Sequence, residues 1–339
     1  MMNDTLLNAT ISALAAARVP WKDLDARGYV VVPGFLNAAE LDGFRADYEA
    51  ADRAASAHNA GPDAATRTAD AIDVPYKVRH VTPAARAAIE AKLNAVAATV
   101  SAQTAVQVNS HAGGPFGNIY FTTGGDRGLS WHQDSVSYYA YQNHHDYVNF
   151  YMPIVKPERA RSNLSVIPFD ALAARSPALA SRVRGKGATR FVAKDGQTVV
   201  HDNDGGGKHG TLPYLLDEIA ATPELDAGDL LLLRGDMIHR TQDTSTRRIA
   251  VSLRMMNAST RVRRAALVRG GLVKTLVMVQ LRKDFSRLFA SFAAAGRDEL
   301  SVEEMSRFEA EVEPRAGIPS QTAFLRFLLW NRLRARLRA

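Results

Sequence analysis

Hydrophobic and polar positions alternate over short stretches in the middle of this chain, with turn residues between the stretches. After Arg248, the side chains of Ile249, Val251 and Leu253 fall on one face of an expected strand, and Arg248 falls on the other. Runs of this kind predict strands over residues 28–33, 104–109, 117–122, 129–132, 147–154, 163–167, 229–234, 237–242 and 247–256. Many short strands separated by turns predict a mainly β fold with flanking helices, built on a double-stranded β-helix of the jelly-roll or cupin type.

Helical spacing of the apolar positions predicts helices on both sides of several of these strands. The predicted helices cover residues 4–18, 38–55, 83–100 and 170–176. The stretch from there to about residue 225 is expected to be irregular. Its glycines at 205–207 are followed by no phosphate-binding or dinucleotide-binding pattern. A mobile lid over a site and a plain surface insertion are both compatible with that stretch.

The last part of the chain has the pattern of helices without strands. Residues 265–282 are mostly apolar, Ser301 and Glu304 form a capping box, and residues 322–338 carry Phe and Leu at helical spacing. We therefore divide the chain into a jelly-roll domain with N-terminal helices over 1–257 and a basic helical C-terminal extension over 258–339.

The positive charge of the chain is concentrated in that extension. Residues 258–339 contain 16 Lys and Arg against 8 Asp and Glu, whereas the other residues contain 26 and 27. We favour a helix over 322–338 that packs on the barrel or on a second copy of the chain, with its arginines in solvent. An anionic membrane and an acidic partner are the alternatives. No nucleic-acid partner is expected, because no aromatic residues interleave a basic stripe.

Composition excludes several chemistries. No cysteine is present, so disulfides, thiolate metal sites and cysteine nucleophiles are excluded. The first residues carry Asp4 where a signal peptide needs a basic region, and no apolar run reaches the 18 or more residues of a membrane span. We therefore expect a cytoplasmic protein without a transmembrane segment.

The segment Trp131-His132-Gln133-Asp134 and the later His239 suggest a metal site. On a strand, residues i and i+2 point to the same face, so His132 and Asp134 can reach one ion while Gln133 faces the other way. His239 begins a separate expected strand. Two imidazoles and one carboxylate form the facial triad that holds Fe(II) and leaves coordination positions open. A lone His-x-Asp is common by chance, and the distal histidine and Arg248 strengthen the prediction.

These pieces, in this order, resemble the phytanoyl-CoA dioxygenase family of Fe(II)- and 2-oxoglutarate-dependent oxygenases. The matching segments are residues 24–41, 131–134, 148–155 and 228–248, and the likeness extends over about 22–257. Residues 162–170 lack the Gly-Ser-His that the family usually carries after its central strand. The extension after Asn257 has no counterpart in the resemblance.

The resemblance implies an oxidoreductase with Fe(II), held by His132, Asp134 and His239, and with 2-oxoglutarate and O2 as cosubstrates. Succinate and CO2 would be released while an unactivated C–H bond of a small molecule, such as one of secondary metabolism, is hydroxylated. Desaturation, cyclisation, epoxidation and demethylation use the same kind of centre and stay open. Asp134 fills the position that halogenating relatives leave to chloride, so no halogenation is predicted.

The resemblance also implies residues for 2-oxoglutarate. Its distal carboxylate needs a planar donor fork, which Arg248 would supply, with Arg247 as the alternative. Thr241 matches a hydroxyl position beside the same carboxylate. Gln133 and Lys77 are looser matches for groups near the other carboxylate, and a solvent-facing role is an equal reading of both.

Substrate contacts are predicted with less support from the pattern. Tyr138 and Tyr139 follow the metal motif, where side chains line a pocket mouth, and Arg254 lies on the inward face of its strand. Ordinary packing and a buried ion pair are the competing readings. A rival function in a different class is a metal-binding jelly roll that acts as a sensor or assembly protein without oxygenase turnover.

Overall fold

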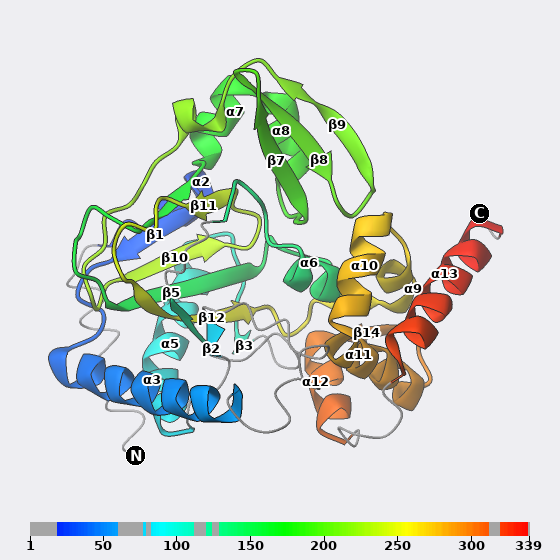
Figure 1. The fold of residues 1–339 in the computed structure, drawn as a ribbon, viewed down its shortest axis with the longest axis horizontal. Coiled ribbons are helices and arrows are strands. Elements are labelled where there is room, and N and C mark those ends of the chain that lie inside the picture. Colours follow the sequence, from blue (N-terminus) through cyan, green and yellow to red (C-terminus); the bar gives the residue numbers. More distant parts are fainter. Residues whose placement is uncertain are drawn as a thin grey trace.

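The computed structural model describes residues 19–59, 77–78, 83–111, 120–123, 129–311 and 319–337. The helix expected over residues 4–18 lies outside the described residues. Figure 1 shows the described part as a strand-rich half and a helical half, with α6 (Val136–Tyr141) between them. Among the described helices, none is long and apolar enough to cross a bilayer.

The larger sheet is antiparallel and has its centre at β5 and β12. Its strands follow the order β1 (Tyr29–Val32), β10 (Leu230–Arg234), β5 (Tyr147–Val155), β12 (Ile249–Met256), β4 (Tyr120–Thr123) and β2 (Lys77–Val78), and β3 (Ser110–His111) also pairs with β12. The strands predicted over 28–33, 147–154, 229–234 and 247–256 are thereby confirmed, each within two residues at either end.

The smaller sheet is built from short pieces. β11 (His239–Thr241) pairs with β6 (Leu164–Val166), Val166 bridges to Ala221, and His132 bridges to His239. Going along the chain, β4, β5, β10 and β12 belong to the larger sheet, and the segments between them belong to the smaller one. This alternation is the winding of a double-stranded β-helix, so the predicted fold is confirmed.

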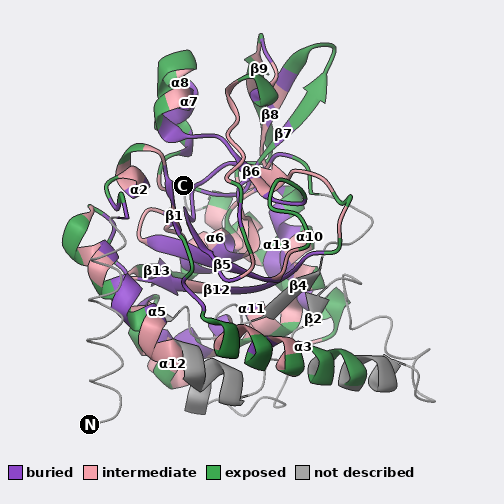
Figure 2. Ribbon diagram, turned by 90° about the vertical axis from the view of Figure 1, so that its left-hand side faces the viewer, coloured by how far each residue is buried: buried purple, intermediate pink, exposed green. Residues whose placement is uncertain are grey.

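The helices α3 (Ala38–Asn59) and α5 (Pro83–Gln103) cover the outer face of the larger sheet. The apolar side chains of β5 and β12, among them Phe150 and Val251, are buried against these two helices. The opposite face is enclosed between the two sheets, where Tyr151 and Ala250 pack with Val166. Figure 2 shows β5 and β12 in purple at the buried centre of the molecule. Arg248 and Arg254, which alternate with the aliphatic residues of β12, therefore face the barrel interior.

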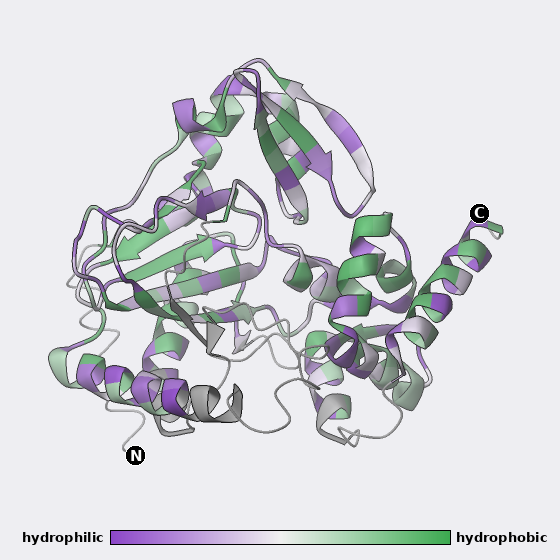
Figure 3. Cartoon of the chain, viewed as in Figure 1, coloured by the Kyte–Doolittle hydropathy of each residue, from purple (hydrophilic) through white to green (hydrophobic). Residues whose placement is uncertain are grey.

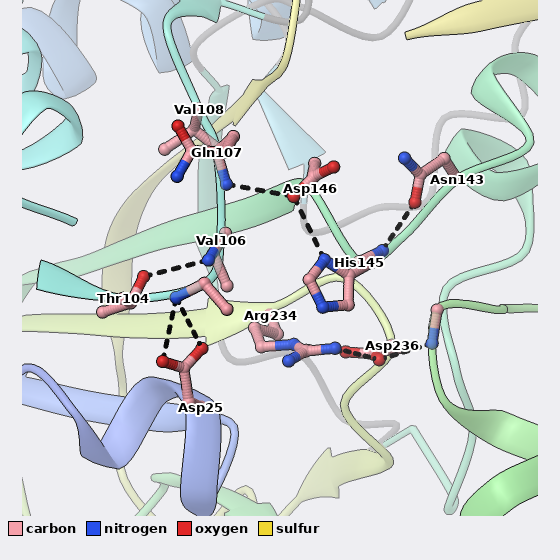
Figure 4. A network of polar contacts seen from close by, with 12 residues as sticks. Asp25, Thr104, Val106, Gln107, Val108, Asn143, His145, Asp146, Arg234 and Asp236 are labelled. Carbon is pink, nitrogen blue, oxygen red and sulfur yellow. Dashed lines mark hydrogen bonds and ion pairs between the residues drawn. The ribbon is translucent and has the colours of Figure 1, made fainter. Parts of the chain in front are cut away.

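The strand predicted over 104–109 is wrong. Its backbone N–H groups are bonded to side chains: Ala105 donates to Asp25 at 2.9 Å, Val106 to Thr104 at 3.1 Å and Gln107 to Asp146 at 3.0 Å. Figure 4 shows this row of capped amides. Side chains that satisfy the backbone locally compete with sheet pairing. Pairing therefore begins at β3, and the strand predicted over 129–132 is reduced to the isolated bridges of His132 with Arg190 and His239.

The stretch between 177 and 225 is regular, contrary to expectation. After α7 (Phe169–Arg175) and α8 (Pro177–Val183), a three-stranded meander forms from β7 (Thr189–Lys194), β8 (Gln197–Asp202) and β9 (Gly207–Leu212), followed by the short helix η1 (Leu216–Ile219). The turn between β7 and β8 is Asp195-Gly196, both at positive φ. Such a dipeptide matches the twist of a two-residue hairpin. The meander extends the smaller sheet beside His132, and the lid and surface-insertion readings of the glycines at 205–207 stay predictions.

The C-terminal extension forms a helical unit whose apolar core is shared with the barrel side, since Tyr139, Tyr147 and Met256 belong to the same cluster. It comprises β13 (Arg261–Arg263), α9 (Arg264–Val268), α10 (Leu272–Gln280), α11 (Arg282–Ala295), β14 (Glu299–Ser301), α12 (Val302–Glu311) and α13 (Gln321–Leu337). The helix predicted over 265–282 is interrupted between α9 and α10, where Gly270 has φ 116°. The predicted capping box is confirmed, since Ser301 N donates to Glu304 at 2.7 Å and Glu304 N donates to Ser301 Oγ at 3.1 Å.

The turn between β8 and β9 packs directly on this helical unit. A Cβ added to Gly206 would lie 2.7 Å from the Cα of Gly271, so the two backbones touch without side chains between them. Next to this contact, the buried Lys274 Nζ lies 2.8 Å from Asp204 Oδ1 and donates to the Ala266 carbonyl at 2.8 Å. The meander and α10 are therefore joined at one point above α6.

Candidate metal centre

His132 and His239 lie opposite each other on neighbouring strands. Each donates its backbone N–H to the carbonyl of the other at 3.0 Å, and their ring centroids are 4.4 Å apart. Asp134 Oδ1 lies 3.8 Å from the Nε2 atom of both imidazoles. One donor atom from each of the three residues lies within 4.8 Å of the others. The predicted triple is thus assembled on one side of the smaller sheet.

Both imidazoles are held by their other nitrogen. His132 Nδ1 lies 2.7 Å from the Ser130 carbonyl, and His239 Nδ1 lies 3.0 Å from the Met237 carbonyl. A carbonyl only accepts, so each Nδ1 carries the hydrogen and each Nε2 directs a lone pair towards Asp134. Two nitrogen donors and one carboxylate, oriented in this way, fit an Fe(II) ion.

The charges at the site suit a cation. Burial lowers the pKa of His132 to about 4, and the neighbouring His239 acts in the same direction. Burial alone would raise the pKa of Asp134, but His239, Arg254 and His132 outweigh it and hold the pKa of this carboxyl well below its usual range. Near neutral pH, His132 is therefore neutral and Asp134 is ionised, which are the forms that bind a metal.

The second oxygen of Asp134 faces β5 and β12. Asn149 Nδ2 donates to Asp134 Oδ2 at 3.4 Å, and an Arg254 guanidinium nitrogen lies 3.9 Å from the same oxygen. Asn149 and Arg254 are opposite each other in the register of the two strands. Their contacts with Oδ2 leave Oδ1 directed towards the histidines.

A buried ion pair supports both metal-binding segments from behind. Arg234 donates to both carboxylate oxygens of Asp236, at 2.9 and 2.6 Å, and neither side chain is exposed to solvent. Asp236 also accepts from the backbone of Gly185 at 2.6 Å, and its carbonyl accepts from Gln133 Nε2 at 2.6 Å. Figure 4 shows the Arg234–Asp236 pair. The pair fixes the turn before His239 and, through Gln133, the segment between His132 and Asp134.

This pair is not among the site residues predicted from the sequence. Arg234 and Asp236 flank a glycine at the end of the apolar run of β10. Two charges of opposite sign at such a point are a signal that a buried ion pair closes the strand. Gln133, predicted beside a cosubstrate carboxylate, uses its amide group on the carbonyls of Val183 and Asp236.

The two candidate arginines for 2-oxoglutarate differ in environment. Arg248 is buried, donates to the Ser162 carbonyl at 2.9 Å and lies over the ring of Tyr151, 5.6 Å from its centroid. Arg247 is exposed. The Tyr151 hydroxyl is buried and has no hydrogen-bond partner among the described residues. This polar group beside Arg248 was not predicted from the sequence. Thr241 lies in β11, where its hydroxyl accepts from the Leu129 backbone at 3.2 Å.

The remaining predicted residues fall in different places. Lys77 lies in β2, and its side chain is outside the described residues. Tyr138 lies edge-on to the ring of His144 at 5.3 Å. Tyr139, 1% exposed, packs into the core of the helical unit beneath Lys274 Nζ. Tyr138 also packs against the edge of this core, although it is less buried than Tyr139.

Two further histidines near the motif serve the surrounding structure. His144 is buried, its Nε2 lies 3.0 Å from Ser137 Oγ, and burial lowers its pKa to about 4. His145 lies 3.1 Å from Asp146, the residue that caps the Gln107 amide. Neither belongs to the group of three that can hold a metal.

Comparison with known proteins gives one family. The model of the phytanoyl-CoA dioxygenase (PhyH) family matches residues 24–250, roughly two thirds of the chain. No curated protein sequence matches.

Three solved structures illustrate what this chain is similar to. The non-heme alpha-ketoglutarate-dependent carbocyclase SnoK from nogalamycin biosynthesis is 14% identical over 74% of this chain and 86% of its own, with a TM-score of 0.44. EctD from S. alaskensis with 2-oxoglutarate and 5-hydroxyectoine is 16% identical over 71% and 76%, with 0.42. HygX from Streptomyces hygroscopicus with nickel and 2-oxoglutarate is 16% identical over 69% and 84%, with 0.40. These TM-scores are below 0.5, so the family assignment depends on the match over 24–250.

Proposed function

Because this chain belongs to the phytanoyl-CoA dioxygenase family and is an oxidoreductase of the Fe(II)- and 2-oxoglutarate-dependent type, we propose that it hydroxylates an unactivated C–H bond of a small-molecule substrate. The substrate R–H, O2 and 2-oxoglutarate would yield R–OH, succinate and CO2. The observation that carries the proposal is the triple His132, Asp134 and His239, with both Nδ1 atoms held by carbonyls and Nε2 directed inward.

Each side chain of the triple has a defined task in this proposal. His132 and His239 bind the ion through Nε2, and Asp134 binds it through Oδ1. Bound there, Fe(II) supplies the oxidation of 2-oxoglutarate and its coupling to the C–H bond. Asn149 and Arg254 hold Asp134 Oδ2, which keeps the carboxylate a one-oxygen ligand and leaves room for a cosubstrate.

Arg248 binds the distal carboxylate of 2-oxoglutarate in the proposal. It is buried on the inward face of β12 beside the Tyr151 hydroxyl, and an Arg fork binds a carboxylate with two parallel hydrogen bonds. Thr241 is the second donor. The exposed Arg247 is the disfavoured alternative. Lys77 and Gln133 stay predictions for the other carboxylate, and the two bonds of Gln133 to carbonyls favour a positioning role.

The substrate is expected to enter beside α6. Tyr138 is part-buried on the side of His144, and Arg254 lies at the far end of the inward face from Arg248, so both are proposed to contact substrate. Tyr139 stays a predicted contact, but its burial in the helical unit favours packing. Asp134 occupies the third ligand position, so chlorination is not expected.

The division of the chain and its location are also proposals. A boundary after residue 257 follows the end of β12 at Met256, beyond which α9 to α13 make up most of the chain. We place the enzyme in the cytoplasm, and fractionation of the native host tests this.

Anaerobic titration of the Fe(II)-loaded protein with 2-oxoglutarate, followed by visible absorbance, tests the proposal. The wild type is expected to develop the weak band of the bidentate complex. Arg248→Ala should need roughly 100-fold more 2-oxoglutarate, because a bidentate charged contact contributes about 3 kcal/mol. Arg247→Ala is the matched control and should titrate like the wild type.

Two outcomes separate the proposal from its rivals. Equal loss in both arginine variants, or loss only in Arg247→Ala, contradicts the assignment of Arg248. No band in any protein that still binds Fe(II) favours the metal-binding sensor or assembly protein. A substrate screen scored by succinate release, with ¹⁸O2 incorporated into the product, then distinguishes hydroxylation from desaturation or cyclisation.

A further inference from the structure

The outer face of α13 is apolar and is not covered by the described chain. Ten large hydrophobic side chains are exposed among the described residues, and eight of them lie on α10 and α13. On α13 they are Phe327, Leu329, Trp330, Leu333 and Leu337. Single exposed apolar residues are ordinary, whereas a concentration of them marks a contact site.

Four of these side chains form one stripe. Phe327, Trp330, Leu333 and Leu337 follow each other at intervals of three, three and four residues, which places them on one side of the helix. The opposite side of α13 is already used, since Phe324 and Leu328 pack into the core of the helical unit and Arg332 donates to Thr275 of α10 at 3.1 Å. The helix therefore has two apolar sides: the fold covers one of them and touches the other at Phe327, whose ring lies edge-on to Phe289 at 5.2 Å. Figure 3 shows apolar residues recurring along α13 between hydrophilic ones.

The hydrophilic residues beside the stripe are arginines. Arg326, Arg334 and Arg336 are exposed, and α13 contains no Asp or Glu. The Arg334 guanidinium lies over the ring of Trp330, 4.9 Å from its centroid, so its aliphatic stem extends along the stripe. Leu, Phe and Trp with flanking arginines are the composition of helices that lie in the plane of a membrane interface.

We infer that the outer face of α13, defined as Phe327, Trp330, Leu333 and Leu337 with the three arginines Arg326, Arg334 and Arg336, binds the surface of an anionic lipid bilayer. Each arginine lies near the lipid phosphates while the stripe enters the boundary between headgroups and acyl chains. The attraction to anionic headgroups is independent of the chemistry in the barrel, so this inference goes beyond the proposed function.

Charge favours lipid over a second copy of the chain. A symmetric dimer through this face would bring each arginine of one α13 close to those of the other, without an acidic residue on the helix to compensate. Position favours lipid over an acidic protein. In Figure 1, α13 forms the outer edge of the helical half. A flat bilayer surface can therefore contact the helix along its whole length.

Trp330 allows a direct measurement. The chain has three tryptophans. Trp21 and Trp131 are 4% and 6% exposed, whereas Trp330 is 53% exposed, so a change of emission on binding reports Trp330. The experiment mixes the full-length protein with vesicles of phosphatidylcholine alone or with phosphatidylglycerol added, and follows co-sedimentation and tryptophan emission.

The anionic vesicles are expected to sediment the protein and to shift its emission to shorter wavelength. Binding should weaken strongly between about 0.1 M and about 1 M salt, because the screening length falls from about 10 Å to about 3 Å. Replacing Arg326, Arg334 and Arg336 by Gln should lower the partition coefficient by about fivefold per arginine. Phe327→Ser combined with Leu333→Ser should remove the emission shift.

Matched controls alter the same residue types elsewhere. Val192→Ser removes an exposed apolar side chain of β7, and Arg182→Gln with Lys194→Gln removes two exposed charges on α8 and β7. These variants should bind vesicles like the wild type. All changes are at exposed positions, and thermal unfolding checks that each variant is folded.

Three results would overturn the inference. One is the absence of co-sedimentation with anionic vesicles at low salt. Another is an equal loss of binding in the controls and the α13 variants. The third is a dimer in sedimentation velocity that Leu333→Ser dissociates while vesicles bind nothing, which would assign the face to a second copy. None of these results affects the titration with 2-oxoglutarate, so failure here and failure of the proposed function are distinguishable.

Discussion

At the mouth of the barrel, charged and polar side chains are buried, whereas along α13 large apolar side chains are exposed. Both arrangements cost free energy unless something compensates them. In the barrel, most of the compensation is visible: Arg234 pairs with Asp236, and carbonyls hold His132 and His239. On α13 it is not part of the described chain. The contrast indicates one site that the fold has already organised and one surface that needs an external contact.

Removal of a metal ligand should have the largest effect. Asp134→Ala takes away one of three donors, so Fe(II) binding and 2-oxoglutarate-dependent O2 consumption should fall well beyond the about 100-fold that loss of an outer partner costs. Equilibrium dialysis with Fe(II) and an oxygen electrode measure the two quantities. A variant that keeps both would show that the triple is not the metal centre.

Breaking the buried ion pair should mainly affect stability. Asp236→Ala leaves Arg234 buried without its partner, so the free energy of unfolding should fall by about 3–5 kcal/mol. The exposed pair of Arg264 and Asp298 is the control, and Asp298→Ala should change stability by less than about 1 kcal/mol. Urea denaturation measures both, and equal effects would mean that Arg234 finds other compensation.

Asn149 tests whether Asp134 is positioned from behind. Asn149→Ala removes the donor to Oδ2, and Fe(II) affinity should fall by about 10- to 100-fold. Thermal unfolding in the absence of metal separates this from a loss of fold. Unchanged affinity would assign the positioning of Asp134 to Arg254 alone.

Acid should weaken the loop that supports Arg248. Burial raises the pKa of Asp243, but hydrogen bonds from Ser245 and Ser162 outweigh it and lower this pKa to about 2. A lowered pKa in the folded state means that the carboxylate stabilises the fold above its ordinary pKa of 3.8 and that this contribution is lost as the pH falls towards 2.

Asp243→Asn should therefore lose less stability than the wild type between pH 4 and pH 2. The side chain is partly exposed, so screening by solvent should keep the difference below about 1 kcal/mol. Urea midpoints at several pH values measure it. A wild type and variant with parallel pH profiles would contradict the lowered pKa.

The smallest effect is expected on the exposed apolar face of α13. Leu333→Ser replaces an exposed side chain, so the stability of the protein in solution should change by less than about 0.5 kcal/mol. Thermal unfolding without vesicles is the measurement. A clear destabilisation would mean that Leu333 is covered within the protein itself.

Much of the fold was predictable because its strands are buried on one or both faces. The alternation of Ile249, Val251 and Leu253 predicted β12 and the inward direction of Arg248. The His-x-Asp spacing and the later histidine predicted the metal triple. These features depend on period and spacing along the chain, which sequence records directly.

The errors arose where local or long-range contacts override that pattern. Side chains of Asp25 and Asp146 cap the backbone near Val106 and prevent a strand there. The strands of the meander were not predicted, although Asp195-Gly196 is a dipeptide typical of a two-residue hairpin turn. Asp204 and Lys274 are 70 positions apart with no pattern that relates them, so the contact between the meander and the helical unit could be recognised only in the structure.

The contact between the meander and the helical unit also limits which segments could replace either of them in a chimeric protein. Gly206 and Gly271 meet backbone to backbone, and a methyl group on either would have to occupy space held by the other. Both positions therefore require glycine, so a graft that replaces the meander or the helical unit must also carry a glycine at the point of contact. A single alanine at Gly206 or Gly271 would force the meander and the helical unit to move apart.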